Sequence, residues 1–227
     1  MQNHTQDLFQ SKLADRRQEE LASGAWLLRG FALDDHRGLL AAVDRIQADA
    51  PFRHLETPGG FRMSVAMTNC GSLGWVSDRR GYRYEPCDPS SGRPWPSMPE
   101  EFLDLARAAA LAGGFADFVP DACLINCYEP GTRLTLHQDR DECDFAHPIV
   151  SVSLGLPAVF LFGGDTRSER QRRIPLIHGD VVVFGGASRR RFHGVSPIKD
   201  GHHELVGPRR LNLTFRRARR AMEMMVD

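Results

Sequence analysis

Residues 148–186, PIVSVSLGLPAVFLFGGDTRSERQRRIPLIHGDVVVFGG, contain the pattern that decides the fold. Short apolar runs rich in Val, Ile, Leu and Phe alternate there with Gly, Pro, Asp and charged residues. Similar runs occur on both sides, at ACLINCY (122–128), RLTLHQD (133–139), RFHGVSP (191–197) and RLNLTFRR (210–217). Short β-prone runs at this spacing are typical of an antiparallel sandwich or jelly roll. The sequence therefore predicts a jelly-roll core over about residues 120–217.

The N-terminal half predicts helices that support this core. Apolar residues recur at helical spacing in DLFQSKLADRRQEELAS (7–23), in DDHRGLLAAVDRIQAD (34–49) and in SMPEEFLDLARAAALAGG (97–114). We expect Asp to cap the second helix and Ser97 or Met98 the third. GAWLLRGFAL (24–33) predicts a strand between the first two helices. We therefore expect one α+β, mainly β domain over residues 1–227.

Residues 51–98 are rich in Gly, Pro and Ser, with aromatic residues scattered among them. This composition predicts a hairpin followed by a long irregular segment. Irregular segments of that length are usually functional or disordered.

Composition excludes several classes of protein. Lys+Arg 29 equals Asp+Glu 29, so the chain has no global cationic field, although arginines gather in the C-terminal half. They indicate either a local cationic face or solvated strand ends. No apolar run approaches the roughly 20 residues that span a bilayer. The five cysteines include no CxxC pair, which favours free thiols in a reducing compartment. We expect a cytoplasmic monomer without membrane contact.

The segment LHQD (136–139) is a candidate metal site. Residues i and i+2 of a strand share a face, so His137 and Asp139 point the same way, about 6–7 Å apart. His193 in RFHGVSP is a candidate third ligand. Two imidazoles and one carboxylate form the facial triad of Fe(II) oxygenases, which leaves coordination positions open. The alternative is a chance HxD with a hydrogen-bonded histidine elsewhere.

The final strand pattern predicts an anion site. Arg210, Asn212, Thr214 and Arg216 alternate with Leu211, Leu213 and Phe215. Two arginines on a buried face are costly unless they meet an anion, and a dicarboxylate would satisfy them. Asn126 and Tyr128 share a face in ACLINCY and would complete the lining. The alternatives are an exposed edge strand with solvated arginines and an ordinary core tyrosine.

Six segments together resemble the AlkB family of Fe(II)/2-oxoglutarate-dependent dioxygenases, which dealkylate nucleic acids. They are TPGGFRMSVAMTNCGSLGW (57–75), PDACLINCYEPG (120–131), LHQDRDE (136–142), PIVSVSLGLPA (148–158), HGDVVVFGG (178–186) and RRLNLTFR (209–216). The likeness covers about residues 8–218. It implies a double-stranded β-helix core, with residues 51–98 as a lid that recognises the nucleotide.

The resemblance also implies roles for individual residues. Fe(II) would be held by His137, Asp139 and His193, and the cosubstrate 2-oxoglutarate by Asn126, Tyr128, Arg210, Asn212 and Arg216. A flipped alkylated base would stack between Trp75 and His137, with Asp141 at its polar edge and Glu142 beside it. Contacts to nucleic acid or substrate would come from Tyr82, Arg83, Tyr84, Arg133, Arg140 and Arg167.

The implied activity is oxidative demethylation of bases such as 1-methyladenine and 3-methylcytosine. The substrate would be single- or double-stranded DNA, with RNA as an alternative. O₂ would be consumed, and formaldehyde, succinate and CO₂ released.

Two other functions are consistent with parts of the pattern. One is a hydroxylase of the same chemistry that acts on a protein or small molecule. The other is a nucleic-acid-binding protein with a structural zinc site, which would need a fourth protein ligand. The remaining histidines that could supply it, which we expect to be solvent-exposed, are His147, His178, His202 and His203.

Overall fold

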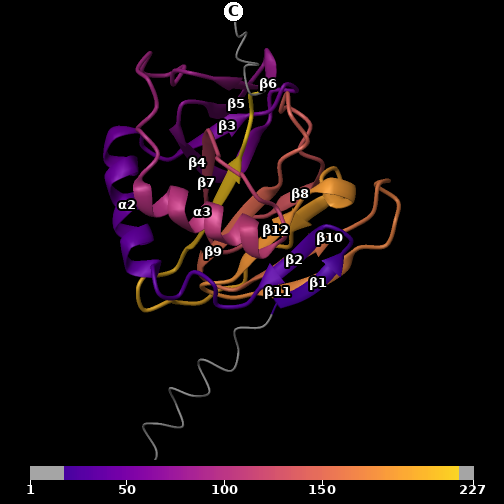
Figure 1. Cartoon of the computed structure of the whole chain (residues 1–227). Coiled ribbons are helices and arrows are strands. Elements are labelled where there is room, and N and C mark those ends of the chain that lie inside the picture. The colour runs from indigo at the N-terminus through magenta and orange to yellow at the C-terminus, as the bar shows by residue number, and fades with distance from the viewer. Residues whose placement is uncertain (1–17, 220–227) are drawn as a thin grey trace, which may run out of the picture.

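The computed structural model describes residues 18–219. A large sheet has the strand order β1-β2-β12-β9-β14-β7-β4-β3, a smaller one the order β11-β10-β13-β8, and β5 pairs with β6 alone (Figure 1). The large sheet contains β1 (Gln18–Ala22), β2 (Ala25–Leu28), β3 (Arg53–Glu56), β4 (Arg62–Gly71), β7 (Ala122–Tyr128), β9 (Ile149–Gly155), β12 (Val181–Phe184) and β14 (Arg210–Arg216). The others are β5 (Gly74–Asp78), β6 (Gly81–Glu85), β8 (Leu134–His137), β10 (Ala158–Phe162), β11 (Arg172–Leu176) and β13 (His193–Val195). This two-sheet arrangement confirms the predicted jelly roll.

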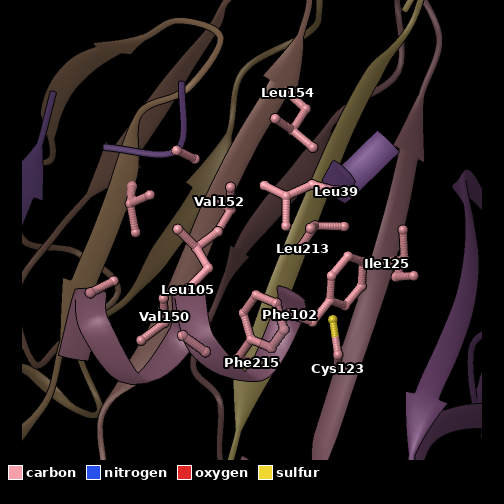
Figure 2. Packing of buried hydrophobic residues seen from close by; sticks show 14 of the residues in the cluster. Leu39, Phe102, Leu105, Cys123, Ile125, Val150, Val152, Leu154, Leu213 and Phe215 are labelled. Atoms are coloured by element: carbon pink, nitrogen blue, oxygen red, sulfur yellow. The ribbon is translucent and has the colours of Figure 1, made fainter. Parts of the chain in front are cut away.

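Two helices, α2 (His36–Asp49) and α3 (Glu100–Ala112), pack on the large sheet. Figure 2 shows Phe102 and Leu105 of α3 lying over residues of β9, β14 and β7. Phe102 meets Phe215 edge to face, with ring centroids 5.6 Å apart. Burying one such side chain contributes about 1.5–3 kcal/mol. The helices thus cover one face of the sheet and leave the other for the smaller sheet.

The face opposite the helices is partly polar. Because side chains alternate along a strand, Leu211, Leu213 and Phe215 join the helix-facing core, whereas Arg210 and Asn212 line a cavity. In the antiparallel register Arg210 lies opposite Tyr128, and Asn212 lies opposite Asn126. The alternation that we predicted for the final strand is confirmed, and all seven of its residues are buried.

The expected helix over 7–23 is wrong in its described part, since residues 18–22 form β1. This strand pairs with β2, with Gln18 opposite Leu28. The backbone of residues 18–22 forms hydrogen bonds with the edge of β2. The helical spacing of apolar residues gives no sign of this pairing. Residues 7–17 lie outside the described range.

The other two helices form where we expected them, but only the first has an expected residue at its N-cap. Asp35 occupies the N-cap of α2, but its side chain makes no capping hydrogen bond. The N-cap of α3 is Pro99 rather than Ser97 or Met98. Neither helix of the described range has the length and apolar content needed to cross a membrane.

Residues 51–98 contain more structure than the expected single hairpin. β3 and β4 form one hairpin and belong to the large sheet, and β5 and β6 form a second one. Asp78 pairs with Gly81 across a two-residue turn of Arg79 and Arg80. Asp78 and Gly81 stand at the first and fourth turn positions, where Asp and Gly are favoured, so the hairpin had a local signal that the expectation of an irregular segment overlooked. The irregular part begins only after Glu85.

Candidate active site

Two strands of the smaller sheet bring three candidate metal ligands together. His137 ends β8, His193 begins β13, and the two residues are register partners. Asp139 follows β8 after one residue. Its Oδ1 lies 3.6 Å from Nε2 of His137, and its Oδ2 lies 3.9 Å from Nε2 of His193. One atom of each residue lies within 4.8 Å of the other two.

Backbone carbonyls orient both imidazoles. Nδ1 of His137 lies 2.9 Å from the carbonyl of Thr135, and Nδ1 of His193 lies 3.0 Å from that of Arg191. A carbonyl accepts only from a protonated nitrogen, so Nε2 is free to bind a metal, an arrangement usual for metal-ligating histidines. Burial, with the nearby His137, lowers the pKa of His193 to about 4. The neutral imidazole is the form that binds a metal.

Asp139 is held ionised by an arginine. Nε and Nη2 of Arg216 donate to its Oδ2 at 3.0 and 2.7 Å. Burial acts to raise the pKa of this carboxyl, but Arg216 and the two histidines outweigh burial and hold the pKa well below its ordinary value. Arg216 therefore contacts a metal ligand directly, which adds to the anion-binding role that the resemblance implied.

Arg210 presents buried donors without protein partners. Its side chain is almost fully buried, and Nη2 donates to Ser153 Oγ at 2.9 Å. Nε and Nη1 have no hydrogen-bond partner among residues 18–219. Burial lowers the pKa of this guanidinium and raises that of the neighbouring Tyr128 to about 12. A cation with free donors beside a neutral phenol fits a carboxylate ligand.

The two asparagines differ in what they leave free. Asn212 donates to Ser151 Oγ and to the carbonyl of Val152, and its Oδ1 accepts from Thr214 and Asn126. Oδ1 of Asn126 is buried without a partner in the described part of the chain. Asn212 is therefore fully hydrogen-bonded, whereas Asn126 has an Oδ1 acceptor left free within residues 18–219.

A cavity of about 490 Å³ joins these groups. All three triad residues line it, as do the cosubstrate candidates Asn126, Tyr128, Arg210, Asn212 and Arg216. Its wall also includes Trp75 of β5 and Tyr82 of β6, whose rings stack with centroids 5.5 Å apart. Trp75 Nε1 donates to Asp141 Oδ2 at 2.8 Å. The β5–β6 hairpin thus closes one side of the cavity that holds the triad.

Comparisons with known proteins agree with this site. Residues 24–216 match the model of the 2OG-Fe(II) oxygenase superfamily. The chain is 54% identical to "Alpha-ketoglutarate-dependent dioxygenase AlkB" of Escherichia coli, over 93% of this chain and 97% of that protein. It is 34% identical to "DNA N(6)-methyladenine demethylase ALKBH1C" of Arabidopsis thaliana, over 63% of this chain and 37% of that one.

A solved structure, "The structure of OsALKBH1", superposes with a TM-score of 0.78 at 32% identity. It covers 88% of this chain and 100% of that chain. The chain belongs to the AlkB family of 2-oxoglutarate-dependent dioxygenases.

As an AlkB-family dioxygenase, the chain uses Fe(II), 2-oxoglutarate and O₂. The residues present fit these groups. The triad offers two nitrogens and one carboxylate, the donor set of non-haem Fe(II) oxygenases. Among residues 18–219 no fourth ligand joins the cluster, so the coordination sphere stays open, unlike that of a structural zinc site. The unpartnered donors of Arg210 suit one carboxylate of 2-oxoglutarate.

Only some of the residues expected to contact the substrate line the cavity. Arg133, Arg140, Arg167 and Asp141 line the cavity and are exposed, as expected for groups that meet a substrate. Arg83, Tyr84 and Glu142 do not line it. Arg83 is bound to Asp78 and Glu85. Tyr84 donates to Glu142 Oε1 at 2.7 Å.

The AlkB-family site contains a residue that the sequence did not reveal. Arg189 is buried, and its Nη1 donates to the backbone carbonyl of Asp139 at 3.3 Å. It is the first of three consecutive arginines, of which Arg190 is exposed. Nothing in the sequence distinguishes the buried one from its neighbours.

Within residues 18–219, the other histidines stay apart from the metal cluster. His202 is exposed, as expected, while His147, His178 and His203 are partly buried. His178 stacks on His203, with ring centroids 4.2 Å apart, and its Nε2 lies 3.0 Å from Nδ1 of His36. Contacts with other rings explain why His178 and His203 are less exposed than we expected.

Proposed function

We propose that this enzyme demethylates N-alkylated bases of the 1-methyladenine and 3-methylcytosine type in DNA, with RNA as the alternative substrate. One observation carries the proposal: the stacked Trp75 and Tyr82 line the same cavity as the metal triad. An aromatic surface beside a reactive centre is what an enzyme needs to hold a base removed from its stack. The relative from Arabidopsis, named as a DNA demethylase, supports the same substrate class.

The charges of the cavity suit a methylated base. Methylation at these ring nitrogens gives the base a positive charge. The exposed Asp141 carboxylate is anchored at the edge of the Trp75 ring, and an aromatic face attracts a cation. We propose that the base lies between Trp75 and His137, so that its methyl group is directed toward the triad.

The protein orients the reactants, and the cofactors supply the oxidant. O₂ gives one oxygen atom to 2-oxoglutarate, which becomes succinate and CO₂, and the other to a C–H bond of the methyl group. The N-hydroxymethyl base then loses formaldehyde. His137, Asp139 and His193 would hold iron. Arg210 and Tyr128 would bind a carboxylate of 2-oxoglutarate, and Asn126, Asn212 and Arg216 would complete its pocket. Apart from His137, these groups are buried, which limits the access of water to the reaction.

We also propose that residues 51–98 serve as the lid that reads the nucleotide, over a core of residues 120–217 within one domain. The lining of the cavity supports these two roles, because Trp75 and Tyr82 belong to residues 51–98 and the triad belongs to residues 120–217. Within the lid, the β5–β6 hairpin would make the base contacts, since β3 and β4 are strands of the large sheet. The exposed Arg133, Arg140 and Arg167 would meet phosphates at the rim.

A monomer in the cytoplasm is the state that we propose for the enzyme. The triad, the cosubstrate candidates and the aromatic pair all line one cavity, which supports a site that works without residues from a second copy. The five cysteines are free thiols, as in most proteins of reducing compartments.

The test is formaldehyde release from a methylated single-stranded oligonucleotide in the presence of Fe(II), ascorbate and 2-oxoglutarate. We expect stoichiometric succinate and formaldehyde, and no formaldehyde from the unmethylated oligonucleotide. Trp75→Ala should weaken oligonucleotide binding and leave 2-oxoglutarate binding near normal. Succinate without formaldehyde from any methylated DNA or RNA would favour a hydroxylase acting on another substrate.

A further inference from the structure

A buried network of four charged side chains lies behind the metal triad. Arg189, Glu142, Arg216 and Asp139 are all at most 9% exposed. Oε1 of Glu142 lies 3.2 Å from Nε of Arg216, and Oε2 lies 3.2 Å from Nη2 of Arg189. Arg216 in turn binds the Asp139 carboxylate. Two cations and two anions therefore balance one another away from water.

Arg189 contacts the metal-binding loop at three places. Besides its ion pair with Glu142, it donates from Nη1 to the carbonyl of Asp139 at 3.3 Å and from Nε to the carbonyl of His147 at 3.1 Å. These partners lie at the beginning, middle and end of residues 139–147. Arg189 does not line the cavity. It can thus fix the path of this loop without touching a substrate.

Glu142 also joins the loop to the β5–β6 hairpin. Tyr84 of β6 donates to its Oε1 at 2.7 Å, and Trp75 of β5 donates to Asp141, the preceding residue. The hairpin therefore has two adjacent hydrogen bonds to the segment that begins with Asp139. Burial, opposed by Arg216, raises the pKa of Tyr84 well above its ordinary value, so its hydroxyl stays a donor.

We propose that Arg189 and Glu142 are positioning residues for the iron ligand Asp139, and that Tyr84 couples them to the base-reading hairpin. Arg189 sets the backbone of Asp139, and Glu142 holds Arg216 against the Asp139 carboxylate. Movement of the hairpin when a base binds is passed to the metal ligand through Tyr84 and Glu142. The coupling part rests on the proposed function, whereas the positioning part does not.

The positioning role is tested by titrating the metal-free full-length protein with Co(II) and recording its visible absorption. Partners that orient metal ligands typically alter metal affinity by about 10–100-fold when mutated. We expect Arg189→Met to lose at least about 10-fold in Co(II) affinity and to change the spectrum. Arg190→Met is the matched control, because this neighbouring arginine is exposed and packs on Phe145; it should bind Co(II) like the wild type.

Arg189→Lys separates positioning from general loss of stability. Lysine keeps a positive charge opposite Glu142, but it lacks the planar fork that reaches two backbone carbonyls while pairing with Glu142. We expect this variant to fold and to show the same weakened Co(II) binding. Wild-type Co(II) affinity and spectrum in Arg189→Lys, or in a folded Arg189→Met, would overturn the positioning role.

The coupling role is tested with Tyr84→Phe, which removes one hydroxyl. Its Co(II) affinity should stay near that of the wild type. Addition of a methylated oligonucleotide should change the Co(II) spectrum of the wild type and produce a much smaller change in the variant. Equal changes in both proteins, or binding without any change in the wild type, would overturn the coupling. An oligonucleotide that does not bind at all contradicts the proposed function instead and leaves the Arg189 result intact.

Discussion

In the proposed complex Asp139 would have two partners of different kinds, a metal and the buried Arg216. Its carboxylate receives two hydrogen bonds from this guanidinium, so its charge is needed even when no metal is bound. His137 differs, because its side chain is one-third exposed and its only hydrogen bond among the described residues is with a nearby backbone carbonyl. The two ligands should therefore contribute differently to stability.

Asp139→Ala should unfold more easily than His137→Ala in the presence of a chelator. The first substitution leaves a buried arginine without its main partner, which typically costs about 3–5 kcal/mol. The second should cost about 1 kcal/mol or less, the usual range for one modest hydrogen bond. Denaturant unfolding of both metal-free variants measures the difference, and both should lack dioxygenase activity. Equal destabilisation would contradict the role that we assign to Arg216.

Arg210→Lys should weaken 2-oxoglutarate binding while leaving the metal site intact. Lysine retains the charge but not the fork that can bind a carboxylate at two points. Losing a buried pair of this kind costs about 2–5 kcal/mol, or roughly 30- to 4,000-fold in affinity. Calorimetric titration with 2-oxoglutarate measures the loss, and Co(II) binding without 2-oxoglutarate serves as the control. A variant with normal 2-oxoglutarate affinity would place the cosubstrate elsewhere.

At the level of secondary structure, the shortest strand has the most critical position. β13 has three residues and lies between β10 and β8, and it places His193 opposite His137. Its middle residue is Gly194, where a Cβ would lie 2.7 Å from the carbonyl oxygen of Leu134 in β8. The close approach of two backbones explains a glycine inside a strand.

Gly194→Ala should therefore push β13 away from β8 and separate the two histidines. We expect a loss of about 1–3 kcal/mol in stability, as for other overpacked sites, together with weaker Co(II) binding. The matched control is Gly38→Ala in α2, where a Cβ meets nothing within 4 Å. That change should stabilise the helix by about 0.5–1 kcal/mol. Thermal melting and Co(II) titration of both variants provide the test; unchanged metal affinity in Gly194→Ala would argue against the predicted strand separation.

The predictions for single elements succeeded where the pattern was local. Each expected strand from residue 122 to 216 is present, because alternation or a short apolar run between Gly and Pro is a property of adjacent residues. Residues 18–22 were missed for the opposite reason, because a strand there depends on the edge of β2. The β5–β6 hairpin was missed although Asp78 and Gly81 stand at positions where turns favour Asp and Gly.

For the whole molecule, the helix-covered face of the large sheet forms the core, and its other face lines the candidate active site. The helices cover the outer face of the large sheet, and the cavity lies on its inner face, toward the smaller sheet. Positive and negative side chains balance over the chain, so attraction for nucleic acid must come from local groups. The exposed Arg133, Arg140 and Arg167 line the cavity and are the local cations that we expect to contact phosphates.

Replacing these three arginines by Gln should reduce the salt dependence of oligonucleotide binding. Each phosphate contact to a single strand contributes about 0.7 to the slope of log K against log [salt]. We expect the slope to fall by about 2. The ratio of wild-type to variant affinity should therefore decrease roughly 16-fold between 50 and 200 mM salt. Arg37, Arg45 and Arg107 of the helices form a matched control triple. Equal slopes in the wild type and the rim variant would exclude phosphate contacts at this rim.

The sequence by itself determined the jelly roll, the polar face of the last strand and the family, and through the family it implies His137, Asp139 and His193 as the ligand set. These follow from spacing within short segments and from motifs that stay contiguous in the chain. The tertiary structure alone decided which arginine does what. Arg210 keeps free donors, Arg216 holds Asp139, and Arg189 is buried behind the metal loop, whereas Arg190 beside it is exposed. A guanidinium has the same chemistry at every position, so its role depends on the acceptors that distant segments bring to it.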